Sequence, residues 1–228
     1  AGFEQALVAA RAAGKPLAEL RGEDFPLPPA LAADVARWRH ALAHGRGFLL
    51  LSGLPVERWG EQDASRFFWG FGLVLGRPGA QNPQGDLLGH VIDTGDDQTN
   101  PLVRLYRTRS DIAYHCDAAD VVGLLCLATA RRGGLSRLAS SVTVYNEVLR
   151  RRPDLAPRLF EPFALDLRSE ERPGMRGWIP VTPCRYEGAA LRTFYHSDYF
   201  RSATRHADAP RLSQDEQALL DLYEAIAN

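Results

Sequence analysis

The sequence predicts a mainly β domain of the sandwich or barrel kind, flanked by helices. Short segments of strand length recur along the chain, and turn-forming residues separate most of them. Segments with helical spacing of apolar residues occur mostly in the first third and at the end of the chain. No linker or internal repeat divides the 228 residues, so we expect a single domain spanning 1–228 with a substantial core.

The predicted helices are defined by apolar spacing together with residues that begin or end helices. Gly14, Gly45 and Pro153 stand where three of these segments should stop. Ser213 and Glu216 form a capping box that opens the last one. The predicted helices are residues 3–13, 31–44, 61–75, 145–152 and 213–228.

The predicted strands are short and either apolar throughout or alternating. The runs at 47–54 and 121–130 are continuously apolar, which is typical of strands buried on both faces. The full set of predicted strands is 47–54, 87–92, 103–107, 111–117, 121–130, 163–168, 178–181 and 191–195.

The composition indicates a cytosolic globular protein. Hydrophobic residues make up 45% and charged residues 24% of the chain, and the net charge of -1 gives no reason to expect nucleic acid or an anionic membrane as a partner. Cys116, Cys126 and Cys184 are widely spaced, which predicts reduced and mostly buried thiols. No signal peptide and no apolar run long enough to span a membrane is visible.

The tripeptide His115-Cys116-Asp117 is the main candidate for a metal site. If 111–117 is a strand, the His115 and Asp117 side chains share one face and Cys116 points away. An imidazole and a carboxylate on one face are two thirds of the 2-His-1-carboxylate triad, which leaves open positions on Fe(II). The alternative is a strand end with a structural histidine and a solvated aspartate.

Two other pairs are weaker candidates. His40 and His44 lie four residues apart on a predicted helix, a spacing that suits a metal, although a solvated helix face explains both. Gln81 and Asn82 lie in a loop-rich region between residues 77 and 101, where substrate contacts are common. Plain turn chemistry is the competing explanation for this second pair.

The segment from residue 111 to 147 closely resembles the TauD/TfdA-like (clavaminate synthase-like) family of Fe(II)- and 2-oxoglutarate-dependent dioxygenases. The resemblance is carried by H-C-D, V-V-G-L-L-C-L, G-G-L-S and S-S-V-T-V-Y-N-E. It implies a double-stranded β-helix, a jelly-roll of the cupin type. It also implies that His115 and Asp117 bind Fe(II) and that Ser136 hydrogen-bonds a carboxylate of 2-oxoglutarate.

The family has a third iron ligand, a late histidine followed by an arginine that pairs with 2-oxoglutarate. The resemblance places both after the helix at 213–228. Downstream of Asp117 the sequence offers His196, in a loop that lines the mouth of the site in relatives, and His206, in a surface turn by composition. We therefore expect the sequence to be C-terminally truncated and, taken alone, inactive in 2-oxoglutarate turnover.

The resemblance implies hydroxylation of a small organic acid, an amino acid or another, with consumption of O2 and decarboxylation of 2-oxoglutarate to succinate. The alternative is a non-catalytic, cupin-like protein that binds a small acid and has a degenerate metal site. A zinc hydrolase is a third hypothesis, but the sequence shows no nucleophile or base at a suitable spacing. No motif indicates the particular acid or an oligomeric state.

Overall fold

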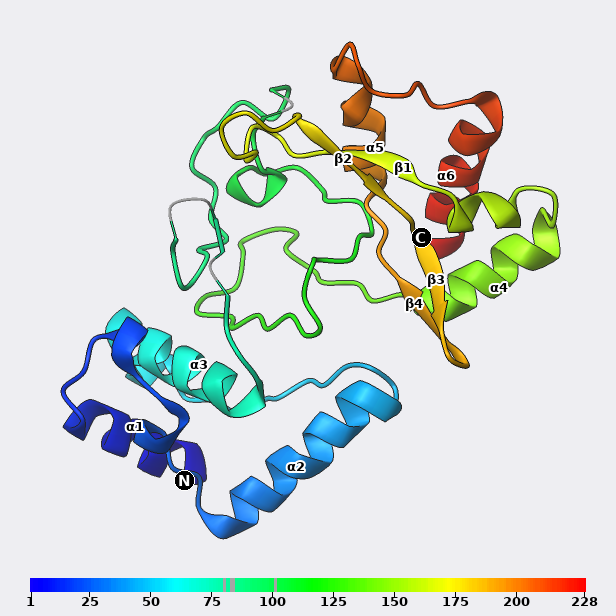
Figure 1. The fold of residues 1–228 in the computed structure, drawn as a ribbon. Coiled ribbons are helices and arrows are strands. Elements are labelled where there is room, and N and C mark those ends of the chain that lie inside the picture. Colours follow the sequence, from blue (N-terminus) through cyan, green and yellow to red (C-terminus); the bar gives the residue numbers. More distant parts are fainter. Residues whose placement is uncertain (80, 83–84, 101) are drawn as a thin grey trace. The chain divides into compact units, whose positions relative to one another are not determined.

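The chain folds into two compact units, which are described in turn (Figure 1). The computed structural model describes residues 1–79, 81–82, 85–100 and 102–228. The first unit comprises 1–90 and 120–134, and the second comprises 91–119 and 135–228.

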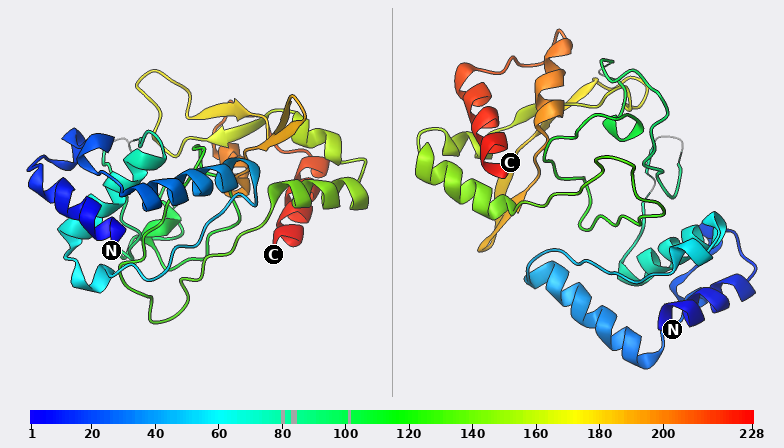
Figure 2. Two further views of the ribbon diagram at one scale, coloured as in Figure 1. Left: turned by 90° about the horizontal axis from the view of Figure 1, so that it is seen from below. Right: turned by 180° about the vertical axis from the view of Figure 1, so that it is seen from behind.

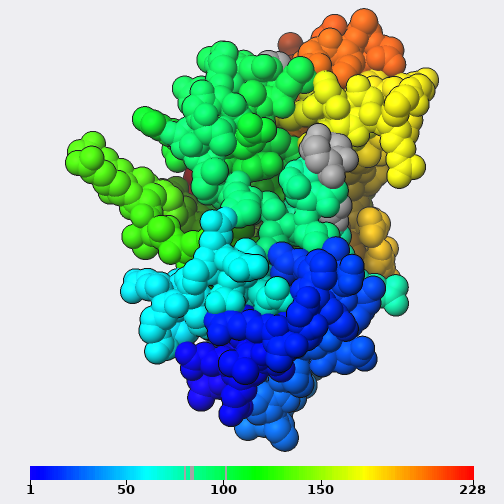
Figure 3. Space-filling model, turned by 90° about the vertical axis from the view of Figure 1, so that its left-hand side faces the viewer, coloured from blue at the N-terminus to red at the C-terminus, as the bar shows by residue number. Residues whose placement is uncertain are grey.

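The first unit is built on three helices, which confirm the first three predicted helices. They are α1 (Gly2–Ala12), α2 (Pro29–His44) and α3 (Glu61–Leu75). Helix α1 packs against α3, as the views in Figure 2 show. Their apolar faces meet around the rings of Phe25, Phe67 and Phe71, and in Figure 3 the blue atoms of the N-terminal segment form a close-packed surface. Phe67, Trp69 and Phe71 of α3 are therefore buried core residues.

Gly70 lies in the middle of α3, where glycine lowers helix stability. A Cβ atom at this position would lie 2.4 Å from a carbon of the Phe25 ring. The glycine therefore lets the Phe25 ring lie directly on the helix backbone, and tertiary packing explains a residue that helix propensity disfavours.

The second unit combines helices with two antiparallel hairpins. Its helices are α4 (Ser141–Arg151), α5 (Ser197–Ser202) and α6 (Gln214–Ala227). Strand β1 (Phe163–Asp166) pairs with β2 (Trp178–Val181), and β3 (Cys184–Glu187) pairs with β4 (Ala190–Thr193). Helix α4 packs against α6, and α5 packs against β1 (Figure 1).

Side chains from all these helices meet in the core of the second unit. Leu219 and Leu220 of α6, Val148 of α4 and Phe200 of α5 are buried there together with Tyr195. Helix α6 begins with the predicted capping box, in which the Glu216 amide donates to the Ser213 hydroxyl and the Ser213 amide donates to the Glu216 carboxylate. Short 3-10 turns connect the elements of both units, at Leu17–Glu19, Gly22–Asp24, Val56–Arg58, Leu105–Arg107, Ala156–Phe160 and Ala203–Arg205.

Several predicted strands are wrong. Residues 47–54 and 121–130 are irregular and largely exposed, with Leu50 88% and Leu124 73% accessible. Residues 87–92 are also irregular, 103–107 contain a 3-10 turn, and 111–117 form only one bridge, between His115 and His196. An apolar run signals a tendency to be buried, but a strand also needs a partner for its backbone groups.

The later strands confirm the sequence-based predictions for 163–168, 178–181 and 191–195 to within two residues at each end. Strand β3 was not predicted, because three of its four residues are polar or charged. The described residues hold two two-stranded sheets and no closed barrel, so the predicted jelly-roll is not seen directly. Among the same residues, no helix combines the length and the apolar character needed to cross a bilayer.

Candidate metal centre

The side chains of His115 and Asp117 lie close together in the second unit. The distance from His115 Nε2 to Asp117 Oδ1 is 3.7 Å, longer than a hydrogen bond but short enough for both atoms to bind one transition-metal ion. Both side chains reach solvent, with 27% and 56% of their surface accessible. The sequence prediction that these two residues point together is therefore confirmed in its geometry.

Their geometry does not depend on a regular strand. His115 pairs with His196 in an isolated antiparallel bridge, and the Cys116 amide donates to the Tyr195 carbonyl at 2.8 Å. The Cys116 side chain packs against the core of the second unit. Cys116 therefore turns toward the core, as predicted, while its two neighbours remain available at the surface.

The protonation pattern of His115 suits a metal ligand. Its Nδ1 lies 2.8 Å from the Ala113 carbonyl oxygen, which can only accept, so Nδ1 carries the proton. The lone pair is then on Nε2, the atom nearest the carboxylate. Histidines that bind metals typically donate their other ring N–H to a carbonyl or carboxylate in this way. The donor set of His115 and Asp117 therefore fits a divalent cation such as Fe(II).

His196 lies between the rings of His115 and Tyr199 and stacks on the second. Its ring centroid is 4.8 Å from that of His115 and 3.7 Å from that of Tyr199. Burial, together with the charges of His115, Arg168 and Arg104, lowers the pKa of His196 to about 3, so its imidazole is neutral at physiological pH. No group of three His, Cys, Asp or Glu side chains within the described ranges is arranged to bind a metal.

The segment that carries His196 is anchored through its neighbour Tyr195. The Tyr195 ring is buried and stacks on Tyr223 of α6 with 3.7 Å between centroids. Its hydroxyl donates to the Leu220 carbonyl at 3.4 Å. Because Tyr195 also accepts from the Cys116 amide, the core of the second unit fixes the backbone on which both histidines lie.

Two arginines that the sequence analysis did not single out lie beside the stacked rings. The guanidinium carbon of Arg168 is 4.2 Å from the centroid of Tyr199, in a cation–π contact. Arg104 pairs with Glu170, its Nε lying 2.9 Å from Oε1. Burial outweighs the charges of both arginines and raises the pKa of Tyr199. The one available sequence signal for Arg168 was its place at the end of a predicted strand.

The other predicted site residues are not part of this group. Ser136 is exposed in an irregular segment and makes no side-chain hydrogen bond within the described ranges. Gln81 and Asn82 belong to the first unit, where they form a local turn. The Gln81 side chain donates to the Gly79 carbonyl, and that of Asn82 donates to the Asp86 carboxylate. These local hydrogen bonds agree with the alternative explanation, in which Gln81 and Asn82 stabilise a turn.

Three further expectations can be compared with the structure. His40 and His44 are exposed with ring centroids 5.0 Å apart, as on a solvated helix face. His206 is not simply in a surface turn, because its Nε2 lies 3.0 Å from the fully buried Asp166 carboxylate. Cys126 is exposed, which corrects the expectation of mostly buried thiols.

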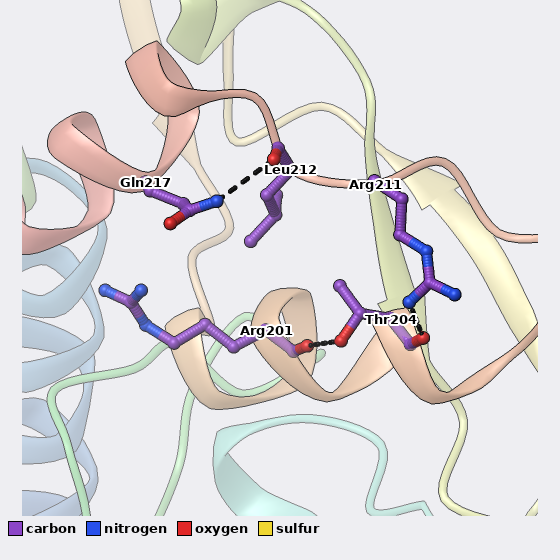
Figure 4. Close-up of a pocket in the computed structure, with 5 residues that line it drawn as sticks. All are labelled: Arg201, Thr204, Arg211, Leu212 and Gln217. Carbon is purple, nitrogen blue, oxygen red and sulfur yellow. Dashed lines mark hydrogen bonds between the residues drawn. The ribbon is translucent and has the colours of Figure 1, made fainter.

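A cavity of about 330 Å³ lies elsewhere in the second unit, at the start of α6 (Figure 4). Arg201, Thr204, Arg211, Leu212 and Gln217 line it. Arg201 pairs with Asp221 at 2.7 Å, and the Gln217 amide donates to the Leu212 carbonyl. None of the candidate metal ligands lines this cavity, so it does not alter the assignment.

Known proteins resemble the chain along most of its length. A family model described as taurine catabolism dioxygenase TauD, TfdA family matches residues 13–228. FR-33289 synthase of Streptomyces rubellomurinus is 35% identical over 195 residues, which cover 85% of the chain and 58% of that relative. Taurine hydroxylase-like protein SAT17 of Stachybotrys chartarum is 30% identical over 161 residues, which cover 68% and 42%. The chain thus spans about half the length of the curated relatives it matches.

Proposed function

The chain belongs to the TauD, TfdA family, and on this premise we propose that residues 1–228 are part or all of an Fe(II)- and 2-oxoglutarate-dependent dioxygenase domain. The observation that carries the proposal is the pairing of His115 and Asp117. Their donor atoms lie 3.7 Å apart, and the imidazole is held with Nε2 free to bind. The substrate class we propose is a small organic acid, since the family description and one relative's name refer to taurine, an amino sulfonic acid.

The roles of the residues follow from their chemistry. Asp117 supplies a negative charge to a dication, and His115 supplies a neutral nitrogen whose orientation the Ala113 carbonyl fixes. Bound iron would activate O2 and couple decarboxylation of 2-oxoglutarate to hydroxylation of the substrate. We propose that Ser136 donates to a 2-oxoglutarate carboxylate, as the resemblance implies. Gln81 and Asn82 are weaker proposals for contact with the substrate.

A second candidate is a cupin-like protein that binds a small acid without catalysis. One observation favours it, because no third metal-binding side chain accompanies His115 and Asp117 within the residues that the structure describes. The two candidates differ in whether iron binds in stoichiometric amounts and whether 2-oxoglutarate is consumed.

The test is anaerobic loading of the full-length protein with Fe(II), followed by addition of 2-oxoglutarate and O2. We expect one iron per chain and formation of succinate. Asp117→Ala should lose both, because it removes the anionic ligand, whereas Asp120→Ala, which alters an exposed carboxylate nearby in the sequence, should keep both. Iron binding and succinate formation that survive Asp117→Ala would exclude this site. Acid binding without iron in the wild type would favour the second candidate.

A further inference from the structure

A row of contacts between side chains connects the candidate metal ligand His115 to Arg168 through the rings of His196 and Tyr199. The His115 ring lies against His196 with 31° between the planes, His196 lies against Tyr199 at 22°, and the Arg168 guanidinium lies over the Tyr199 ring. All four groups belong to the second unit. The Arg168 guanidinium is therefore the last group in a row of contacts that begins at the proposed iron ligand His115.

Among the described residues, the Arg168 guanidinium has no anionic partner. In the part of the chain that the structure describes, no carboxylate lies within 4.0 Å of it, and the neighbouring Glu170 and Asp166 pair with Arg104 and Arg205 instead. Of its five N–H donors, one donates to the Val103 carbonyl at 3.2 Å. The Nε atom is buried and has no hydrogen-bond partner within the described residues. Buried donors without partners are uncommon and costly, so this one calls for an explanation.

A tight turn holds the backbone at Arg168. Arg168 and Ser169 both have left-handed φ angles, of 49° and 65°, which non-glycine residues rarely adopt. The Arg168 amide donates to Asp166 Oδ1 at 2.9 Å, and the Leu167 amide donates to the Gly177 carbonyl at 2.8 Å. The Glu170 amide donates to the Leu167 carbonyl at 2.9 Å, so Arg168 and Ser169 are the central pair of a type I′ turn, in which both φ angles are positive. The turn fixes the backbone, and the contacts with Val103 and Tyr199 restrain the guanidinium, which lowers the entropy cost of binding a ligand.

We propose that Arg168 binds the anionic group of the substrate, a carboxylate or sulfonate, by hydrogen bonds from the free donors of its guanidinium. Guanidinium groups suit such oxyanions because their N–H groups form a planar fork. The cation–π contact with Tyr199 is made through the guanidinium carbon and uses none of the N–H donors. That the bound anion belongs to a substrate rests on the proposed function. The binding of an anion by Arg168 does not require iron.

The test is titration of the full chain with methanesulfonate and with acetate, followed by calorimetry and by the arginine Nε–H signals in NMR spectra. We expect saturable binding of at least one of these anions, with the Arg168 signal shifting. Arg168→Gln should raise the dissociation constant at least about tenfold, since hydrogen bonds to charged groups are lost. Arg168→Lys keeps the positive charge but lacks the planar set of N–H donors, so it should weaken binding less. This variant also tests whether the fold tolerates a substitution at residue 168.

The matched control is Arg176→Gln. Arg176 also lies over an aromatic ring, with its guanidinium carbon 5.6 Å from the centroid of Trp178, and it is far more exposed. Anion binding should be unchanged in this variant. It should also persist in a His115→Ala, Asp117→Ala double variant, which separates the anion site from the proposed iron site. Absence of saturable binding, or equal losses in the Arg168 and Arg176 variants, would overturn the proposal.

Discussion

Asp166 offers the sharpest test of the packing in the second unit. Its carboxylate is fully buried at the end of β1, where it accepts from Arg205 Nε at 2.8 Å and from Arg205 Nη2 and His206 Nε2 at 3.0 Å. It also accepts from the Arg168 amide. Asp166→Ala would leave these donors unsatisfied around a small void.

The expected loss can be estimated from the burial of the partners. Removing one member of a buried ion pair typically costs about 3–5 kcal/mol. About a third of the Arg205 side chain is exposed, 32%, so it can turn toward water, and we expect a loss near the lower limit, about 3 kcal/mol. For a chain of this size, that corresponds to a fall in Tm of roughly 6–12 °C.

The matched control is Asp154→Ala, which breaks an exposed pair with Arg152 and should cost at most about 1 kcal/mol. Urea unfolding followed by near-UV circular dichroism measures both variants. A loss for Asp166→Ala no larger than for Asp154→Ala would refute the buried network.

The same carboxylate predicts a pH dependence. Burial alone would raise the pKa of Asp166, but the bonds from Arg205 and His206 outweigh it and hold that pKa well below its usual range. A group with a lowered pKa in the folded state stabilises the fold above its unfolded-state pKa, about 3.9, and loses that contribution as the pH falls toward the folded-state value. The difference in unfolding free energy between wild type and Asp166→Ala should therefore be constant near neutral pH and shrink below about pH 4.

Three further predictions concern the core, the thiols and the cofactor. Leu219→Ala should lower the unfolding free energy by about 2–5 kcal/mol because the side chain is fully buried, whereas Leu135→Ala, on an exposed leucine, should leave it within about 0.5 kcal/mol in the same urea titration. Burial raises the pKa of Cys184 to about 11, so iodoacetamide at pH 8 should modify the exposed Cys126 first, and mass spectrometry showing Cys184 modified as fast would contradict its burial. Ser136→Ala should raise the KM for 2-oxoglutarate about tenfold or more, because one hydrogen bond to a charged group is lost, and an unchanged KM would remove Ser136 from the site.

The sequence was most informative where local signals determine structure. Helices α1, α2, α3 and α6 were predicted to within about two residues, because apolar spacing, glycine stops and the Ser213 capping box act within a few residues of one another. The runs at 47–54 and 121–130 were misassigned, because whether an apolar run becomes a strand depends on a distant partner.

The candidate site shows the same division. The proximity of His115 and Asp117 follows from their spacing in the chain and was predictable, even though the strand that motivated it is a single bridge. The contacts of His196, Tyr199 and Arg168 were not, since they join segments far apart in the sequence through ring stacking. His206 was misread for that reason as well, because its buried partner Asp166 is 40 residues away.

The assignment of His115 and Asp117 as iron ligands can be tested by the anaerobic absorption spectrum of the full-length protein with Fe(II), recorded before and after addition of 2-oxoglutarate. We expect a new absorption band that requires both Fe(II) and 2-oxoglutarate. It should be present in wild type and in Cys116→Ser, because the Cys116 side chain faces the core, and absent in His115→Ala. Iron analysis of the same samples should show metal in the first two and none in the third. If the band and the bound iron survive in His115→Ala, the assignment of His115 and Asp117 as the iron ligands is contradicted.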